Sequence, residues 1–275
     1  MAINPLASHF RQPKIFVSLP SKGVYNRPGA IQGDVGNLAV YGMTGMDEII
    51  SKTPDALMTG QASIDVIKSC MPSISDPWEL TALDTDLVFA AIRIATYGNE
   101  IHISNTCSNC STENEYDIDL SYIMEHYNSV RYNNTLYVND LILKTRPLTY
   151  KQMTEFNLKN YSMQQQVKQA DNMEDPTEKQ KFIDNVWKDL ADLQKKLAML
   201  SVESVEINGQ AVTERGHIVE WLENCDREVT SAIESHIQDN RSAWNMPRKT
   251  VKCESCQHED NLLLDLDQSN FFVKA

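Results

Sequence analysis

Two pairs of cysteines in this chain have the spacing of metal-binding knuckles. Cys107 and Cys110 lie in the stretch HISNTCSNCSTENEYDIDL, and Cys253 and Cys256 lie in VKCESCQHEDNLLLDLDQS. A structural zinc ion takes four tetrahedral ligands, and one C-x-x-C turn supplies only two of them. The two pairs together therefore predict one structural Zn2+ site with Cys107, Cys110, Cys253 and Cys256 as its ligands.

The residues that follow each pair indicate one unit used twice. Cys107–Leu120 aligns with Cys253–Leu266, and the alignment places Asn114 over Asp260. In each copy, polar turn residues precede a run that can form a strand, as in a zinc ribbon. The usual four-cysteine signature separates its pairs by about 15 to 20 residues, far fewer than here. The cost of closing a loop rises only logarithmically with its length, so a folded insertion remains compatible with a shared site.

Other uses of the cysteines stay open at this point. A C-x-x-C pair can act as a redox dithiol, or the four residues can be reduced structural cysteines. His102 and His258 lie close enough in sequence to replace a cysteine ligand. Cys70 and Cys225 lie in helical patterns, where a buried free thiol is the simpler expectation.

Composition limits the classes of function. The chain has 275 residues, 41% of them hydrophobic, and a formal net charge of -13, so we expect a globular protein. A strongly acidic surface repels phosphate backbones and anionic lipid headgroups, which opposes nucleic-acid and membrane binding. No apolar run approaches the ~18 residues of a membrane span, and we expect reduced cysteines in a cytosolic setting.

Changes of pattern along the chain predict a helix-rich α+β protein. We expect five segments: an extended N-terminal arm rich in Pro and Gly (1–45), a helical unit (46–100), the first knuckle with a β-hairpin (101–147), a largely helical insertion (148–246), and the second knuckle with a C-terminal strand (247–275).

Local signals predict several elements inside these segments. Asp84 is expected to cap a helix that ends at Gly98. Asn139 with Asp140 predicts the turn of one β-hairpin, and Asn208 with Gly209 predicts another.

Two apolar seams predict a long helical hairpin in the insertion. Apolar residues recur at steps of three and four on both sides of the turn DNMEDP, the pattern of a coiled coil. Whether this seam packs within the chain or on a partner is left open. The seam residues are Met153, Phe156, Asn160, Met163, Val167 and Ala170 on the first arm, and Ile183, Val186, Leu190, Leu193, Leu197 and Leu200 on the second.

The common catalytic motifs are missing from the sequence. It contains no G-x-x-x-x-G-K-[ST], G-x-G-x-x-G, G-x-S-x-G or H-E-x-x-H. Pairs of nearby carboxylates occur, but helix caps and solvated strand faces explain them. A zinc ion with four cysteine ligands leaves no position for a reacting water. We therefore expect no catalytic residues, no organic cofactor and no enzymatic activity.

Three segments, in this order, resemble a known family. They are IFVSLPSKGVYN, MTGMDEIISKTPDALMTGQASIDVIKSCMPSI, and LDTDLVFAAIRIATYGNEI followed directly by the first C-x-x-C. Over residues 14–125 they resemble the T4-type bacteriophage baseplate hub and baseplate hub assembly proteins of contractile-tailed phages. Zinc binding is inferred from the cysteines and not from this resemblance.

The resemblance implies a non-enzymatic structural or assembly protein, found in the virion tail baseplate after assembly in the host cytoplasm. Its partners would be other hub or tail proteins, with the arm lying along a neighbouring subunit. We expect deletion of residues 1–30 to leave a folded protein that no longer joins its partner. Two questions are left open: whether the chain associates with copies of itself, and whether it stays in the finished particle or leaves after assembly. Alternatives are a zinc-ribbon nucleic-acid-binding protein and, with less support, a thiol oxidoreductase.

Overall fold

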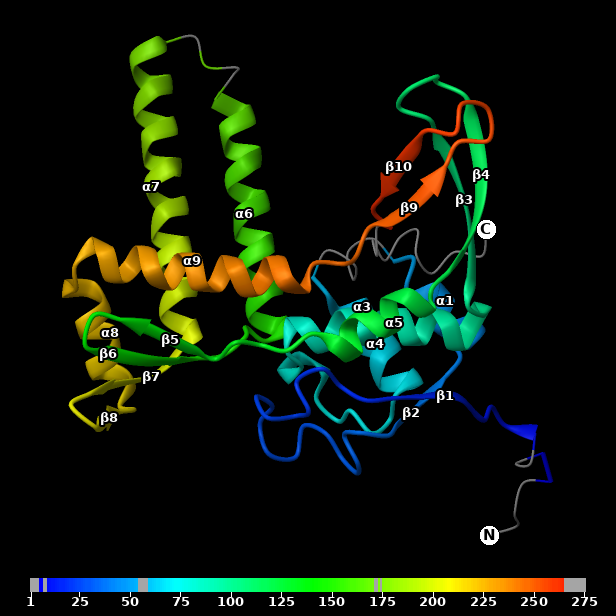
Figure 1. Cartoon of the computed structure of the whole chain (residues 1–275). Coiled ribbons are helices and arrows are strands. Elements are labelled where there is room, and N and C mark those ends of the chain that lie inside the picture. The colour runs from blue at the N-terminus through cyan, green and yellow to red at the C-terminus, as the bar shows by residue number, and fades with distance from the viewer. Residues whose placement is uncertain (1–4, 7–8, 54–58, 171–172, 174, 265–275) are drawn as a thin grey trace. The chain divides into compact units, whose positions relative to one another are not determined.

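The chain forms two compact units in a computed structural model that describes residues 5–6, 9–53, 59–170, 173 and 175–264 (Figure 1). Unit 1 contains the described residues up to Val130 and those from Asn245 onward, and unit 2 runs from Arg131 to Trp244. The predicted fold class is confirmed, because the structure is a helix-rich α+β protein with small antiparallel sheets. The β-hairpin that the sequence places beside the first knuckle lies in unit 2 with the insertion.

Unit 1 is built around one buried helix, α4. This helix contacts α3, α5 and both strands of the first sheet, and its side chains are buried around most of its circumference, including Leu87, Val88 and Ile92. The elements of unit 1 are β1 (Pro13–Val17), β2 (Leu38–Tyr41), α1 (Gly45–Ile50), α3 (Gln61–Cys70), η2 (Pro77–Glu79), α4 (Ala82–Tyr97), β3 (Glu100–Thr106), β4 (Glu113–Asp119), α5 (Ser121–Ser129), β9 (Lys249–Lys252) and β10 (Glu259–Leu262). Residues 54–58 of the predicted helical unit and residues 265–275 of the predicted C-terminal segment lie outside the described residues.

The segment predicted as an N-terminal arm is extended, but from residue 11 onward it is part of the core of unit 1. Strands β1 and β2 pair antiparallel and both contact α4. Leu19 and Val40 are fully buried. The expectation of an arm that is free to lie along a neighbouring subunit is therefore wrong for these residues. Their apolar side chains are removed from water by packing on α4, which holds the segment in place.

Asp84 connects this segment to α4. The helix is capped by Thr81 and not by Asp84 as predicted, and Gly98 ends it as expected with φ 91°. The Asp84 carboxylate is fully buried and accepts the Ser21 N–H at 2.9 Å and the Thr81 hydroxyl at 2.8 Å. Burial raises the pKa of Asp84, against these hydrogen bonds. A carboxyl group this deep is tolerable only because its oxygens are satisfied.

Arg11 fixes the first described residues of the segment. Its guanidinium donates to the Gly42 carbonyl at 2.8 Å and to the Ser69 hydroxyl at 2.9 Å. It also lies 3.5 Å from the carboxylate of Asp47, which is buried. Residues before Arg11 have exposed side chains where they are described, including Phe10 at 58%.

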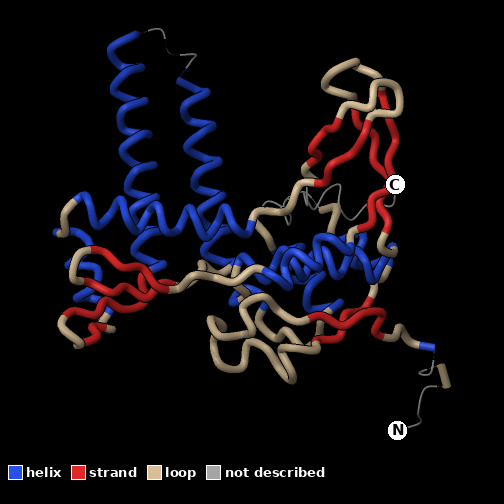
Figure 2. Tube along the Cα trace, in the orientation of Figure 1, coloured by secondary structure: helices blue, strands red, loops and turns tan. Residues whose placement is uncertain are grey.

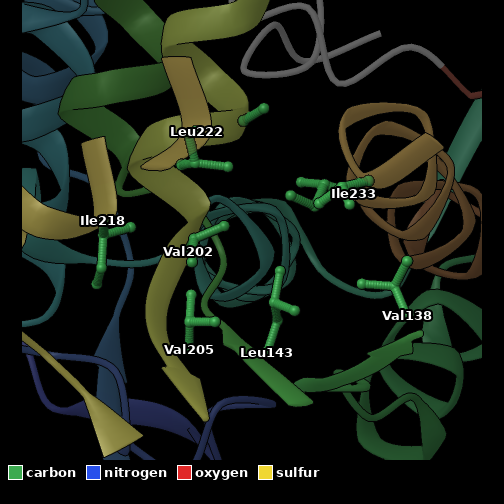
Figure 3. Packing of buried hydrophobic residues seen from close by; sticks show 9 residues of the cluster. Val138, Leu143, Val202, Val205, Ile218, Leu222 and Ile233 are labelled. Atoms are coloured by element: carbon green, nitrogen blue, oxygen red, sulfur yellow. The ribbon is translucent and has the colours of Figure 1, made fainter. Parts of the chain in front are cut away.

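Unit 2 is a four-stranded antiparallel sheet of order β5-β6-β7-β8 with helices packed on it. Figure 3 shows its hydrophobic core, in which side chains of the strands meet those of α7, α8 and α9. Val202, Leu143 and Ile233 lie at its centre, each at most 1% exposed. The elements are β5 (Thr135–Val138), β6 (Leu141–Thr145), α6 (Tyr150–Ala170), α7 (Pro176–Ser201), β7 (Val202–Ile207), β8 (Gln210–Val212), α8 (Arg215–Asn224) and α9 (Arg227–Trp244).

Both predicted β-hairpin turns of unit 2 are confirmed. Asn139 joins β5 to β6 with φ 53°, and Asn208 with Gly209 joins β7 to β8 with φ 50° and 78°. The Asn208–Gly209 turn has two positive φ values, which suits the twist of antiparallel strands, and Asn and Gly tolerate that conformation best. In the other turn only Asn139 has a positive φ.

The predicted helical hairpin is also present. Helices α6 and α7 contact each other, and Asp175 caps α7 through the N–H groups of Thr177 and Glu178. The described seam side chains are buried or half-buried, with the exception of Leu200 at 39% exposure. The seam therefore packs largely within the chain, while coiled-coil interlocking of its side chains stays a prediction.

A buried polar network joins the two ends of unit 2. The His236 Nε2 atom lies 3.0 Å from the Thr145 hydroxyl and 3.2 Å from the Asn240 amide. The Asn240 side chain in turn accepts the Asn133 N–H at 2.9 Å and donates to the Asn133 carbonyl at 3.1 Å. The first residues of the unit are thus held on its last helix.

None of the helices in the described part of the chain is both long enough and apolar enough to cross a bilayer.

The packing of the N-terminal segment predicts opposite results for two truncations. Deleting residues 1–30 removes the buried Leu19, which costs about 2–5 kcal/mol of folding stability. It also leaves the buried Asp84 carboxylate without its Ser21 partner, which costs about 1–3 kcal/mol more. This replaces the expectation from the sequence that the variant stays folded: we expect it to lose the thermal unfolding transition of unit 1 in circular dichroism. Deleting residues 1–9 removes no described buried side chain, so a transition within a few degrees of the full chain is expected. Equal stability of the two variants would contradict this assignment.

His236 predicts that unit 2 loses stability in mild acid. Burial lowers the pKa of this imidazole from its ordinary value of 6.5, so the unfolded chain binds the proton at a higher pH than the folded chain. Stability then falls as the pH drops below about 6.5. Thermal unfolding at pH 7.5 and pH 5.5 should show a smaller decrease for His236→Gln than for the wild type. His217→Gln, at an exposed position of α8, is the control and should behave as the wild type.

Candidate metal centre

Two β-hairpins of unit 1 carry the four cysteines of the predicted site. Cys107 and Cys110 lie in the turn between β3 and β4, and Cys253 and Cys256 lie in the turn between β9 and β10. Figure 2 shows the two hairpins with these turns at the same end. Each hairpin is antiparallel with a regular register, so each pair of strands presents its turn as a knuckle.

The four sulfur atoms converge on one point. All lie within 4.8 Å of one another, with the Cys107 Sγ 3.7 Å from the Cys256 Sγ and the Cys110 Sγ 3.6 Å from the Cys253 Sγ. Tetrahedral ligands at a Zn–S distance of about 2.3 Å would be about 3.8 Å apart. No disulfide joins these cysteines, and both of these contacts run between the knuckles, as expected for ligands of one shared ion.

The backbone of the two knuckles is the same. The amide of the first cysteine donates to the carbonyl five residues on, at 2.9 Å in both turns, and its carbonyl accepts from the residue four positions on, at 3.0 and 2.9 Å. That fourth residue has a left-handed conformation in each, Ser111 with φ 59° and Gln257 with φ 60°. The sequence alignment therefore reflects a repeated three-dimensional unit.

Hydrogen-bond donors surround the sulfurs. Backbone N–H groups of Cys110 and Asn109 point at the Cys107 Sγ, and those of Cys256 and Ser255 point at the Cys253 Sγ. These bonds lower the pKa of the Cys253 thiol. At Cys107 the backbone bonds act in the same direction, but burial and the neighbouring Cys110 and Cys256 thiols outweigh them and raise its pKa to about 12. Thiolates are the form that binds metal, so a donor set that stabilises negative sulfur fits a metal ion.

The second cysteine of the first knuckle has donors of its own. The Thr112 hydroxyl and backbone N–H lower the pKa of Cys110 to about 6, and the Asn109 amide lies 3.6 Å from the Cys256 Sγ. Cys107 and Cys253 are buried, whereas Cys110 is exposed and Cys256 is half-buried. With four sulfurs the coordination shell is complete, which suits a structural ion and not a catalytic one.

The other cysteines and histidines considered from the sequence lie apart from this cluster. The His102 Nδ1 is 2.9 Å from an oxygen of Asp117, and the His258 Nε2 is 3.7 Å from Asp260. Cys70 is fully buried, and burial raises the pKa of its thiol to about 12. Cys225 is half-buried on α8's end. In the described part of the chain, the four knuckle cysteines are the group whose ligand atoms converge.

Three residues of the site were not assigned a role from the sequence. Asn114, Asp260 and Ser108 make hydrogen bonds between the two knuckles. The equivalence of Asn114 and Asp260 in the sequence alignment was the available signal, but alignment alone does not show which backbone groups they would meet.

Comparison with known proteins gives one match. A family model described as T4 bacteriophage base plate protein matches residues 42–273. Neither the curated proteins nor the solved structures contain a match to the chain. The matched range includes all four knuckle cysteines and most of both units. This chain belongs to the T4 bacteriophage base plate protein family.

Proposed function

We propose that this chain is a non-enzymatic structural or assembly protein of the baseplate hub of a contractile-tailed phage. The observation that carries the proposal is the family match over residues 42–273. The chain's role is to bind other hub or tail proteins, and its place is the tail baseplate of the virion. The net charge of -13 supports protein partners over nucleic acid, because an acidic surface repels phosphates.

We further propose that Cys107, Cys110, Cys253 and Cys256 hold a structural Zn2+ ion. Sulfur distances of 3.6 and 3.7 Å between the knuckles support it, as do the N–H groups that point at the sulfurs. A bound Zn2+ supplies a cross-link between the two hairpins and, with a filled shell, no reacting water. The ion therefore stabilises unit 1, and none of the four knuckle thiols is left for redox exchange.

Exposed apolar side chains on each unit support binding to other proteins. Large apolar side chains that are exposed in the isolated chain often mark surfaces that a partner covers, although single exposed ones are common. In unit 1 they include Phe16, Met46 and Ile49, and in unit 2 they include Tyr161 and Trp187 on the helical hairpin.

Metal analysis tests the zinc site. Purified wild-type protein should contain one zinc ion per chain by inductively coupled plasma mass spectrometry. The double variant Cys107→Ser, Cys253→Ser should contain almost none and should melt at a lower temperature, since a thiolate is removed from each knuckle. The matched control is Cys225→Ser, which changes a cysteine outside the cluster and should retain the zinc. A folded, metal-free wild type would refute the site.

Quantitative mass spectrometry of phage particles tests the role in the baseplate. A structural subunit should be present at a fixed copy number relative to tail-tube and hub proteins, because a closed symmetric assembly has a defined stoichiometry. An assembly factor should be abundant in infected-cell lysate and absent from particles. Equal absence from particles and from hub-assembly intermediates in the lysate would refute both forms of the proposal.

A further inference from the structure

The knuckles are connected by side chains as well as by sulfur. The Asn114 Oδ1 accepts the Glu254 N–H of the second knuckle at 3.0 Å. Asp260 accepts the Ser108 N–H of the first knuckle at 3.3 Å and the Ser108 hydroxyl at 2.5 Å. Asn114 and Asp260 each follow the first cysteine of their own knuckle by seven positions, and each donor group follows the first cysteine of the other knuckle directly. The contacts are thus reciprocal.

From this geometry we propose that Asn114 and Asp260 are the positioning residues of the metal site. This inference rests on the metal site of the proposed function. Each holds the amide at the start of the opposite knuckle, which sets the orientation of the two amides that follow. Those two amides are the ones that point at the Cys107 Sγ and at the Cys253 Sγ. Each hairpin therefore shapes the other hairpin's sulfur environment before an ion arrives.

The two positions need different side chains. Asn114 is 4% exposed, and while its oxygen accepts from Glu254, its Nδ2 donates to the Thr112 carbonyl at 2.9 Å. A carboxylate at position 114 would place an acceptor against that carbonyl and a charge beside four thiolates. Across the knuckles, Asp260 accepts the N–H and the hydroxyl of Ser108 through separate oxygens, while the His258 imidazole of its own hairpin lies 3.7 Å away. The Ser108 hydroxyl can rotate to accept from an amide. Asparagine should therefore replace Asp260 but aspartate should not replace Asn114.

Metal affinity is the measurement that tests this assignment. Zinc binding to the full chain would be measured by competition with a chromophoric chelator, and Co2+ spectra would report the sulfur coordination. We expect Asn114→Ala and Asp260→Ala each to weaken zinc binding about 10–100-fold, the range for residues that orient metal ligands. Asn114→Asp should be at least as weak as Asn114→Ala, whereas Asp260→Asn should stay within about threefold of the wild type.

Tyr116→Phe is the matched control. The Tyr116 hydroxyl donates to the Lys252 carbonyl at 3.2 Å, so it joins the same two hairpins without touching a knuckle amide. Its loss should leave zinc affinity and the Co2+ spectrum unchanged. If an alanine variant fails to fold, Ser108→Ala removes one of the two Asp260 contacts and should weaken binding by a smaller factor.

The outcomes separate this inference from the proposed function. A wild type that binds neither Zn2+ nor Co2+ refutes the metal site and the inference with it. A wild type that binds zinc together with alanine variants of equal affinity refutes the positioning role alone. If Tyr116→Phe weakened zinc binding as much as the alanine variants do, the positioning role would also be refuted. Any hydrogen bond between the hairpins would then have the same effect on zinc affinity.

Discussion

The convergence of the two cysteine knuckles is the constraint that makes the residues from Asn245 onward part of unit 1. The sulfur contacts join residues 149 and 143 positions apart, with the whole of unit 2 between them in sequence. Closing so long a loop costs little more than closing one of half its length, because the entropy grows with the logarithm of length. Unit 2 has its own core, so its folding brings its two ends together and removes most of that cost. The chain can therefore form a ribbon from segments near opposite ends of the sequence.

Side chains that accept distant backbone N–H groups are a recurring device in both units. Asp84 accepts from a residue 63 positions away, Asn240 from one 107 away and Asn114 from one 140 away. Each bond contributes only about 0.5–1.5 kcal/mol net, yet leaving either buried partner unpaired costs about 1–3 kcal/mol. Such contacts therefore add little net stability, but they determine which segments can pair. Packing of the apolar residues supplies the larger share of the energy.

What the sequence predicted well was encoded locally. The C-x-x-C spacing, the Asn turns at positions 139 and 208, and the helical periodicity on both sides of DNMEDP each depend on a few neighbouring residues. The N-terminal segment was misjudged because Pro and Gly content reports the absence of helix and not the absence of packing. Its burial depends on α4, some 60 residues further on, and no local pattern encodes that contact. The capping of α4 was misjudged for the same reason, since Asp84 turns inward to Ser21.

The proposed metal site would offset the low stability of the two hairpins. Two-stranded hairpins are marginal in water unless another layer covers one face, and here the face between the hairpins buries few side chains, among them Ile118 and Val251. The opposite face of β4 is acidic and exposed at every second residue, from Glu113 to Asp119, and like charges so close repel. The hydrogen bonds of Asn114 and Asp260 orient the knuckles but bury little apolar area. The proposed four-sulfur ion would add a cross-link at the end of the ribbon where hydrophobic burial is least, and the presence of the same cysteine turn in both hairpins fits that role.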